Sequence, residues 1–259
     1  MIIKSNAKVN LNLRVCGRIG LLHEIESIIV PISLYDTITI EENNEDIILG
    51  MDIPYKDNIM YKALVMFKEK FGVEDCYKIT IDKTIPVQAG LGGGSSNAAS
   101  VLKVLGEIYD INYKDLIDLS SEIGSDVTFF MYNKPSLVRG SGNVITTYEN
   151  FSKQYGVLVF DNDMFSAKEM YTRYDLLESE KNYETDNVYL NDLERSLSAL
   201  EKEKIDSIKK TLMTNGALYS LMSGSGGTVF GIFKSSYEAK KCEESLIGKY
   251  NKVVAFETI

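Results

Sequence analysis

The N-terminal segment alternates between apolar and polar residues. Over residues 7–15 the apolar positions are Ala7, Val9, Leu11, Leu13 and Val15. The polar positions between them are Lys8, Asn10, Asn12 and Arg14. A period of two places each set on its own face of an extended chain. The pattern therefore predicts a half-buried β-strand, with the polar set on the face away from the core.

The remaining chain divides into short apolar runs and longer stretches with helical spacing. The short runs predict strands at 24–30, 36–41, 77–82, 135–138, 144–148, 155–160, 229–233 and 252–257. Helical spacing predicts helices at 57–70, 95–108, 113–123, 202–215 and 236–246, and the polar segment 178–186 predicts a loop. Because strands and helices interleave without a regular βαβ period, we expect an α+β fold of two lobes rather than a doubly wound sheet.

Composition narrows the class of protein. The chain has 259 residues, of which 44% are hydrophobic and 25% are charged, as in an ordinary soluble domain pair. Its net charge of −9 argues against nucleic acid or an anionic membrane as a partner. No apolar run is long enough to span a membrane and the N-terminus lacks a signal-peptide pattern, so we expect a cytoplasmic protein. The sequence leaves the oligomeric state open.

Cysteine and histidine usage excludes two kinds of site. Cys16, Cys76 and Cys242 are scattered without CxxC or metal-ligand spacing, so they are expected to be reduced thiols. The single histidine, His23, rules out a histidine-rich metal centre.

A glycine-dense loop carries the strongest chemical signal. Between Pro86 and Ser96 the chain has four glycines in five positions, and the predicted helix follows directly. Glycine lets the backbone approach a ligand closely, and a helix N-terminus offers unpaired N–H groups to an anion. The loop lacks the lysine of a Walker A motif. Asp110 follows the helix without an intervening strand, which does not fit a dinucleotide-binding fingerprint. A nucleotide phosphate is the expected ligand.

The order Pro-x-x-x-Gly-Leu-Gly-Gly-Gly-Ser-Ser-x-Ala-Ala from Pro86 onwards resembles the phosphate loop of the GHMP kinase superfamily. Further blocks at 5–13, 124–130, 191–194 and 222–230 resemble motifs of the same superfamily, in the same order. Within it, Ala-Lys-Val-Asn-Leu at 7–11 and Asn-Asp-Leu-Glu at 191–194 are most similar to the 4-diphosphocytidyl-2-C-methyl-D-erythritol kinase family. Together these blocks cover nearly the whole chain.

This resemblance implies a fold and an activity. The expected fold has an N-terminal ribosomal-protein-S5-like lobe over residues 1–150 and a C-terminal ferredoxin-like lobe over residues 151–259. The expected reaction is phosphoryl transfer from ATP, with Mg²⁺, to the 2-hydroxyl of the cytidine-diphosphate-linked methylerythritol, in isoprenoid precursor synthesis. Such chemistry depends mainly on positioning and charge stabilisation.

The resemblance also assigns roles to residues. Asp126 would accept the hydroxyl proton and Lys8 would neutralise developing charge. The residues implied in ATP binding are Asn58, Lys83, Pro86, Gly90, Leu91, Gly92, Gly93, Gly94, Ser95 and Ser96, with Ser96 also a candidate ligand of Mg²⁺. The residues implied in substrate binding are Asn10, His23, Lys134, Tyr171, Ser223, Gly224, Ser225 and Gly226.

The sequence departs from the family pattern at the expected cytosine pocket. Leu22 stands where the family has a stacking tyrosine before its histidine, and Thr128 replaces a proline. Two alternatives therefore stay open. One is another GHMP kinase, of the homoserine or mevalonate type. The other is a catalytically silent nucleotide-binding regulator on the same fold.

Overall fold

The computed structural model describes residues 1–161, 165–177 and 189–259. The chain forms two compact units that each combine segments distant in the sequence. The first unit comprises residues 1–7, 34–87 and 92–134, and the second comprises residues 8–33, 88–91 and 135–259. The chain therefore passes between the units within its N-terminal strand, within a long strand and within the glycine loop. Each unit is described separately below.

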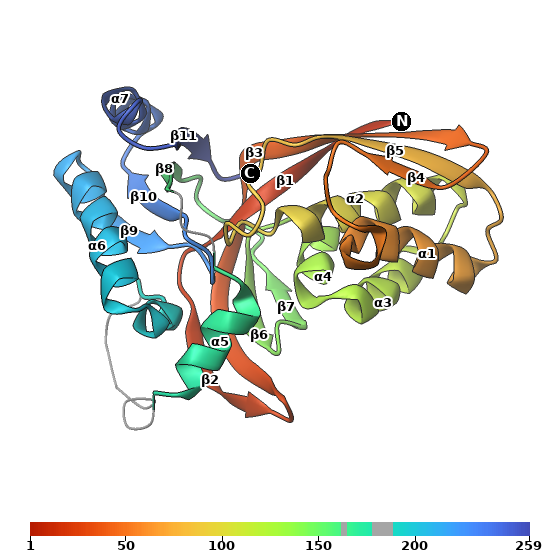
Figure 1. The fold of residues 1–259 in the computed structure, drawn as a ribbon, viewed down its shortest axis with the longest axis horizontal. Coiled ribbons are helices and arrows are strands. Elements are labelled where there is room, and N and C mark those ends of the chain that lie inside the picture. Colours follow the sequence, from red (N-terminus) through yellow and green to blue (C-terminus); the bar gives the residue numbers. More distant parts are fainter. Residues whose placement is uncertain (162–164, 178–188) are drawn as a thin grey trace. The chain divides into compact units, whose positions relative to one another are not determined.

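The first unit is built on strands from the beginning of β1 (Ile2–Asn10), the second part of β3 (Leu22–Asn43), β4 (Ile47–Leu49) and β5 (Cys76–Asp82). β5 runs antiparallel to β3 and parallel to β4. A 3-10 turn at Tyr55–Asp57 precedes four helices, α1 (Ile59–Phe71), α2 (Gly93–Ile108), α3 (Tyr113–Ile123) and α4 (Ser125–Tyr132). The helices lie on one face of these strands (Figure 1). Apolar residues of both layers are fully buried between them, among them Ile38, Leu64, Phe67, Leu102 and Phe129.

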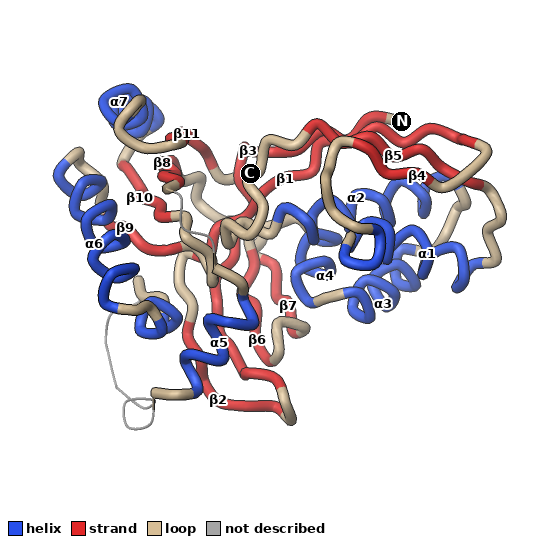
Figure 2. The backbone as a smooth tube through the Cα atoms, in the orientation of Figure 1, coloured by secondary structure: helices blue, strands red, loops and turns tan. Residues whose placement is uncertain are grey.

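The second unit contains an antiparallel sheet in the order β11-β8-β10-β9. Its strands are β8 (Tyr155–Phe160), β9 (Tyr219–Met222), β10 (Val229–Phe233) and β11 (Lys252–Glu257). Helices α6 (Ala199–Thr214) and α7 (Ser236–Leu246) pack on one face of this sheet (Figure 2). α5 (Ala167–Asp175) and a 3-10 turn at Asp192–Ser196 add Met170 and Leu193 to the same core.

The first part of β3 also belongs to the second unit. It forms a hairpin with β2 (Arg14–Ile19) and pairs over residues 25–29 with β6 (Ser136–Gly140). β6 in turn pairs with β7 (Val144–Thr147). The strand predictions at 24–30 and 36–41 therefore describe one continuous strand. Pro31 lies between them, and its carbonyl accepts a hydrogen bond from the amide of Ile259.

Several predicted elements are confirmed to the residue: β8, β10, β11, α3 and α7. Local chemistry explains the sharp helix starts. The Asn112 side chain accepts a hydrogen bond from the first turn of α3, and Ser235 does the same for α7. The predicted α+β class is confirmed. The division into lobes at residue 150 stays a prediction, and the predicted loop at 178–186 lies outside the described residues.

The prediction for residues 7–15 is wrong in two respects. β1 ends at Asn10, and the polar positions Lys8, Asn10 and Asn12 are as buried as the apolar ones. The reason is a chain of hydrogen bonds that compensates the polar groups. The side-chain Nδ2 group of Asn10 donates to Ser27 Oγ at 2.8 Å, and the backbone amide of Ile28 donates to Asn12 Oδ1 at 2.6 Å. Such pairing removes most of the cost of burying polar atoms.

Two helices, α4 and α5, were not predicted. Both are short, and their side chains show no extended apolar stripe. Short helices depend on tertiary contacts rather than on intrinsic propensity, so sequence periodicity reports them poorly. Among the described helices, whose longest members have 16 residues, none is long and apolar enough to cross a bilayer.

Candidate active site

In the second unit, Lys8 is a buried ammonium with a defined partner. Its side chain is 5% exposed, and Nζ donates to Asn10 Oδ1 at 2.5 Å. Its backbone amide donates to the Leu91 carbonyl at 3.0 Å, which ties β1 to the glycine loop. A lysine that faced solvent would need neither contact. The structure therefore brings Lys8 and Asn10, from one motif, together with Leu91 of the distant glycine loop.

The C-terminal glycine motif packs against the same residues. A Cβ atom on Gly224 would lie 3.1 Å from Lys8 Nζ, and one on Gly226 would lie 2.1 Å from the amide nitrogen of Gly90. A Cβ on Gly90, whose φ is +76°, would lie 2.0 Å from the Ser223 carbonyl oxygen. Ser223 Oγ also donates to the Gly90 carbonyl at 3.2 Å. At Gly90 and Gly226 the backbones approach so closely that only glycine fits.

Asn191 holds the glycine motif in place. Its Nδ2 group donates to the carbonyls of Met222 and Gly224, at 2.8 and 2.7 Å. Glu194 accepts the Met222 amide at 2.8 Å and is itself bound by Lys209 at 2.6 Å. The Asn-Asp-Leu-Glu segment thus positions the loop that approaches Lys8. The sequence singled out this segment only as a resemblance, and a role for it was missed.

In the first unit, the start of α2 is suited to bind an anion. Gly92 precedes the helix in the left-handed conformation, and among the described residues no side chain caps the helix or places a carboxylate in its first turn. By contrast, a side chain caps the N-terminus of each of five other helices, α1, α3, α5, α6 and α7. The amides of Gly93, Gly94 and Ser95 start the helix without that competitor, and the helix dipole favours negative charge there.

Lys83 lies beside this helix start and is paired with a carboxylate that the sequence did not flag. A Cβ on Gly93 would lie 3.0 Å from Lys83 Nζ. That ammonium contacts Asp36 Oδ2 at 2.5 Å, and Asp36 is fully buried. The other oxygen of Asp36 accepts the amides of Thr84 and Ile85, both at 2.8 Å. Asp36 therefore fixes both the lysine and the chain that enters the glycine loop.

Ser96 and Asn58 have structural partners within the first unit. Ser5 Oγ donates to Ser96 Oγ at 2.7 Å, and Ser96 is 3% exposed. Asn58 Oδ1 accepts the Met60 amide at 3.0 Å and so caps α1. The next residue, Ile59, lies 3.4 Å from the Cβ position of Gly94. Four residues predicted to bind the nucleotide thus cluster around the start of α2: Asn58, Lys83, Gly93 and Gly94.

Asp126 is the second residue of α4 and is half-buried. Thr128, where the family has proline, donates its amide to the Gly124 carbonyl at 3.3 Å and bonds to Ser120 at 3.1 Å through its hydroxyl. The threonine is therefore accommodated by the helix. Lys134 follows α4 and is exposed.

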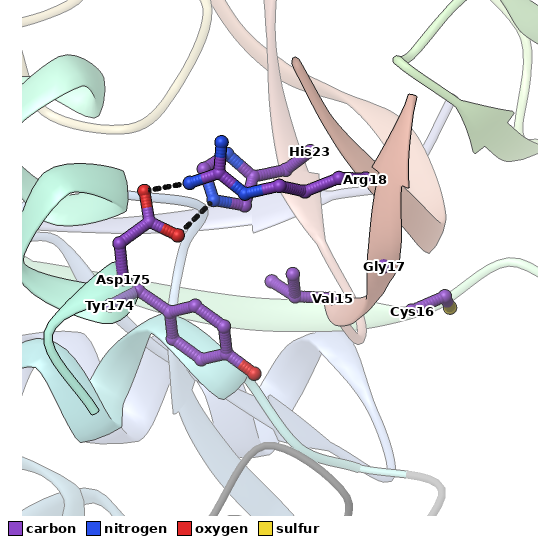
Figure 3. Close-up of a pocket in the computed structure, with 7 residues that line it drawn as sticks. All are labelled: Val15, Cys16, Gly17, Arg18, His23, Tyr174 and Asp175. Carbon is purple, nitrogen blue, oxygen red and sulfur yellow. Dashed lines mark hydrogen bonds and ion pairs between the residues drawn. The ribbon is translucent and has the colours of Figure 1, made fainter. Parts of the chain in front are cut away.

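The second unit also has a pocket of ≈ 260 Å³ around His23 (Figure 3). His23 Nε2 lies 2.9 Å from Asp175 Oδ1, and Arg18 pairs with the same carboxylate. Partial burial opposes ionisation of Asp175, but its hydrogen bonds with Arg18 and His23 lower its pKa below the usual value. The Tyr171 ring stacks on His23, with 4.6 Å between centroids. Leu22 is 60% exposed. The predicted partners His23 and Tyr171 are thus adjacent, and Asp175 and Arg18 were missed.

Comparison with known proteins identifies the family. The model of the GHMP kinases N terminal domain matches residues 58–134, and that of the GHMP kinases C terminal domain matches residues 174–252. A protein from Clostridioides difficile (strain 630), named 4-diphosphocytidyl-2-C-methyl-D-erythritol kinase, is 37% identical over 97% of this chain and 93% of its own length. The chain belongs to the GHMP kinase family. It is accordingly an ATP-dependent small-molecule kinase.

Other relatives of this GHMP kinase agree with that assignment. A Clostridium tetani protein of the same name is 34% identical over the full length of both chains. A crystal structure of 4-(cytidine 5'-diphospho)-2C-methyl-D-erythritol kinase has 26% identity and a TM-score of 0.86, and covers 100% of this chain and 99% of its own. Mevalonate kinase from Methanococcus jannaschii, at 15% identity and a TM-score of 0.71, shares the fold.

Proposed function

We propose that this GHMP kinase transfers the γ-phosphoryl group of ATP to the 2-hydroxyl of 4-diphosphocytidyl-2-C-methyl-D-erythritol, in isoprenoid precursor synthesis in the cytoplasm. The full-length relatives that carry that name support the choice of substrate. The observation that carries the proposal is the buried Lys8 ammonium, fixed by Asn10 and approached by the backbone of Gly224. A buried cation held beside a glycine backbone is suited to a polyanionic substrate.

The start of α2 would hold the nucleotide phosphates. Its amides have no side-chain cap among the described residues, and Lys83 adds a positive charge beside Gly93. Bound Mg²⁺ would neutralise charge on the phosphates. We expect Ser96 to contribute little to Mg²⁺ binding, because its hydroxyl is buried and already hydrogen-bonded to Ser5. Within the described part of the chain no group of three or more His, Cys, Asp or Glu side chains would hold a metal, so phosphate oxygens and water would be its main ligands.

Asp126 is proposed to accept the proton of the attacking hydroxyl, while Lys8 stabilises charge in the transition state. Asp126→Asn should cut kcat by about 10²–10⁴, the usual contribution of a positioned base, and leave ATP affinity intact. The kcat of a Lys8→Met variant should fall more than its KM rises. If the two residues act on one transition state, the double variant should be far less impaired than the product of the single effects.

The pocket around His23 is proposed to bind cytosine. Asp175 orients the imidazole, and Tyr171 supports its face. A site that hydrogen-bonds a base edge loses much of its affinity when that group is removed. His23→Ala should therefore raise KM for the cytidine substrate at least tenfold and leave KM for ATP unchanged. Lys134, Ser223 and Ser225 are proposed to contact the remainder of the substrate.

One experiment separates the candidates. ATP consumption is measured with the cytidine-linked substrate, homoserine and mevalonate in turn, with Asp126→Asn as the matched inactive control. Turnover of the cytidine-linked substrate alone supports the proposal. Turnover of homoserine or mevalonate instead favours another GHMP kinase. Tight ATP binding by calorimetry with no turnover of any of the three favours a silent nucleotide-binding regulator.

A further inference from the structure

The helix that carries Asp126 is too short to fix its own position. α4 has eight residues and begins at Ser125, and its N-cap residue, Gly124, offers no side chain to cap it. An isolated helix of this length is unstable in water, so its neighbours determine where it lies. Asp126 stands in its first turn, which means that any tilt of the helix moves the carboxylate.

Two side chains from neighbouring helices bind the other end of α4. Lys103 Nζ, from α2, donates to the Phe130 carbonyl at 2.8 Å. The Tyr113 hydroxyl, at the start of α3, donates to the Met131 carbonyl at 2.5 Å. Both carbonyls belong to the last turn, where no intrahelical donor is available. The two contacts therefore satisfy groups that would otherwise lack a partner within the helix, and they link α4 to both α2 and α3.

Lys103 also places a positive charge where the helix dipole favours one. α4 has no basic residue in its own last turn, so the lysine of α2 takes that place. Burial lowers the pKa of Lys103 to about 8. The other titratable side chains of α2, α3, α4 and α1, the helices of this bundle, are Glu107, Tyr113, Lys114, Asp115, Asp118, Glu122, Asp126, Tyr132, Tyr61, Lys62, Lys68, Glu69 and Lys70.

We propose that Lys103 and Tyr113 are positioning residues that hold α4 at its C-terminal end and thereby set the position of Asp126. The inference rests on the proposed role of Asp126 as the catalytic base. Neither residue belongs to the motifs that carry the family resemblance. Their effect on the reaction would pass through the helix, because both side chains donate hydrogen bonds to its backbone carbonyls.

The test compares Lys103→Met with Lys103→Arg and Tyr113→Phe. Lys103→Met should lower kcat about tenfold, since small misplacements of a catalytic group are costly, while KM for ATP changes less than about twofold. Lys103→Arg keeps a charged donor and should recover most of the rate. Tyr113→Phe removes only the hydroxyl of a side chain that is 48% exposed, so it should fold normally, and it should lower kcat about two- to fivefold.

Combining Lys103→Met with Asp126→Asn distinguishes positioning from general damage. If Lys103 acts through Asp126, its loss should change the residual rate of the Asp126→Asn enzyme less than about twofold. The positioning role alone would be overturned if Lys103→Met lowered the rate by the same factor in the wild-type enzyme and in Asp126→Asn. A wild-type kcat in both Lys103→Met and Tyr113→Phe would also overturn it. Wild-type kcat in Asp126→Asn itself would overturn both that role and the proposed base.

The pH dependence gives a second readout that a structural role would not produce. The folded-state pKa of Lys103 lies below its ordinary value of 10.5, so between pH 8 and 10.5 the unfolded chain binds more protons. The Lys103 contribution to the free energy of unfolding should therefore rise with pH in this window. Over the same window kcat should fall as the ammonium loses its charge. Lys103→Met and Lys103→Arg should each remove both trends, because neither side chain titrates in this window, but only Lys103→Arg should keep most of the rate. A kcat that rises together with the free energy of unfolding between pH 8 and 10.5 would contradict the proposal.

Discussion

Replacing Asn191 with leucine tests how strongly the Asn-Asp-Leu-Glu segment holds the glycine motif. Leucine has nearly the same size, but it cannot donate to the carbonyls of Met222 and Gly224 or accept the amide of Leu193. Asn191 is 5% exposed, so solvent cannot replace these bonds easily. Each of the three partners left without its hydrogen bond costs about 1–3 kcal/mol in desolvation. The buried leucine returns about 1.5–3 kcal/mol, and we expect a net loss of ~2–6 kcal/mol.

The assay is urea unfolding followed by circular dichroism, combined with steady-state kinetics at a temperature where the variant is folded. Asn43→Ala serves as the control, because Asn43 makes one exposed hydrogen bond to the Glu45 carbonyl and should cost less than about 0.5 kcal/mol. The kcat/KM of Asn191→Leu should also fall at least tenfold, since a displaced Gly224 changes the surroundings of Lys8. Stability and kinetics equal to those of the Asn43→Ala control would refute the reasoning.

Three further predictions concern the glycine loop, the proposed catalytic residue Lys8 and the His23 pocket. Gly90→Ala should unfold at a lower urea concentration than Gly94→Ala. A Cβ on Gly90 would lie 2.0 Å from the Ser223 carbonyl oxygen, whereas one on Gly94 would lie 3.4 Å from the Ile59 side chain. Equal urea midpoints for the two variants would show that the loop backbone shifts to make room for the methyl group. Lys8→Met should keep ATP affinity in calorimetry while losing turnover, and a lost affinity with normal kcat would make Lys8 a binding residue only. Because its pKa is lowered, Asp175 should stabilise the fold above pH 3.8 and lose that effect as pH falls through its folded pKa, so Asp175→Asn should be less stable than wild type at pH 6 and converge with it at low pH. A stability difference that persists in strong acid would contradict this assignment.

Much of the fold was determined locally by the sequence. α3 and α7 start at Asn112 and Ser235 because those side chains satisfy first-turn amides, and β8, β10 and β11 are continuous apolar runs. Caps and apolar runs act over a few residues, so they are visible without tertiary information. The glycine loop was equally apparent, because a dense run of glycines before a helix is visible in the sequence itself and lets the backbone approach a ligand closely.

The burial of polar residues was decided by the tertiary structure. Alternation in the N-terminal segment correctly placed Lys8 and Asn10 on one side of β1, but it could not show that these side chains, and that of Asn12 beyond the strand, are buried. Their partners, such as Ser27 and the Ile28 amide, lie 16 or 17 residues further along the chain. Hydrophobic patterning reports where apolar groups are buried and carries no information about polar groups compensated at long range.

The same limit applies to the residues that support the site. Asn191 acts on Met222 and Gly224, Asp36 acts on Lys83, and Asp175 acts on His23, over separations of 31 to 152 residues. Asp36 and Asp175 are common polar residues with no distinctive neighbours in the sequence, and Asn191 stood out only as part of a family motif. The sequence by itself therefore determined the family and most of the secondary structure, and it predicted which residues would meet the ligands. Only the folded chain decided what holds those residues in place, because hydrogen-bond partners are chosen by proximity in space.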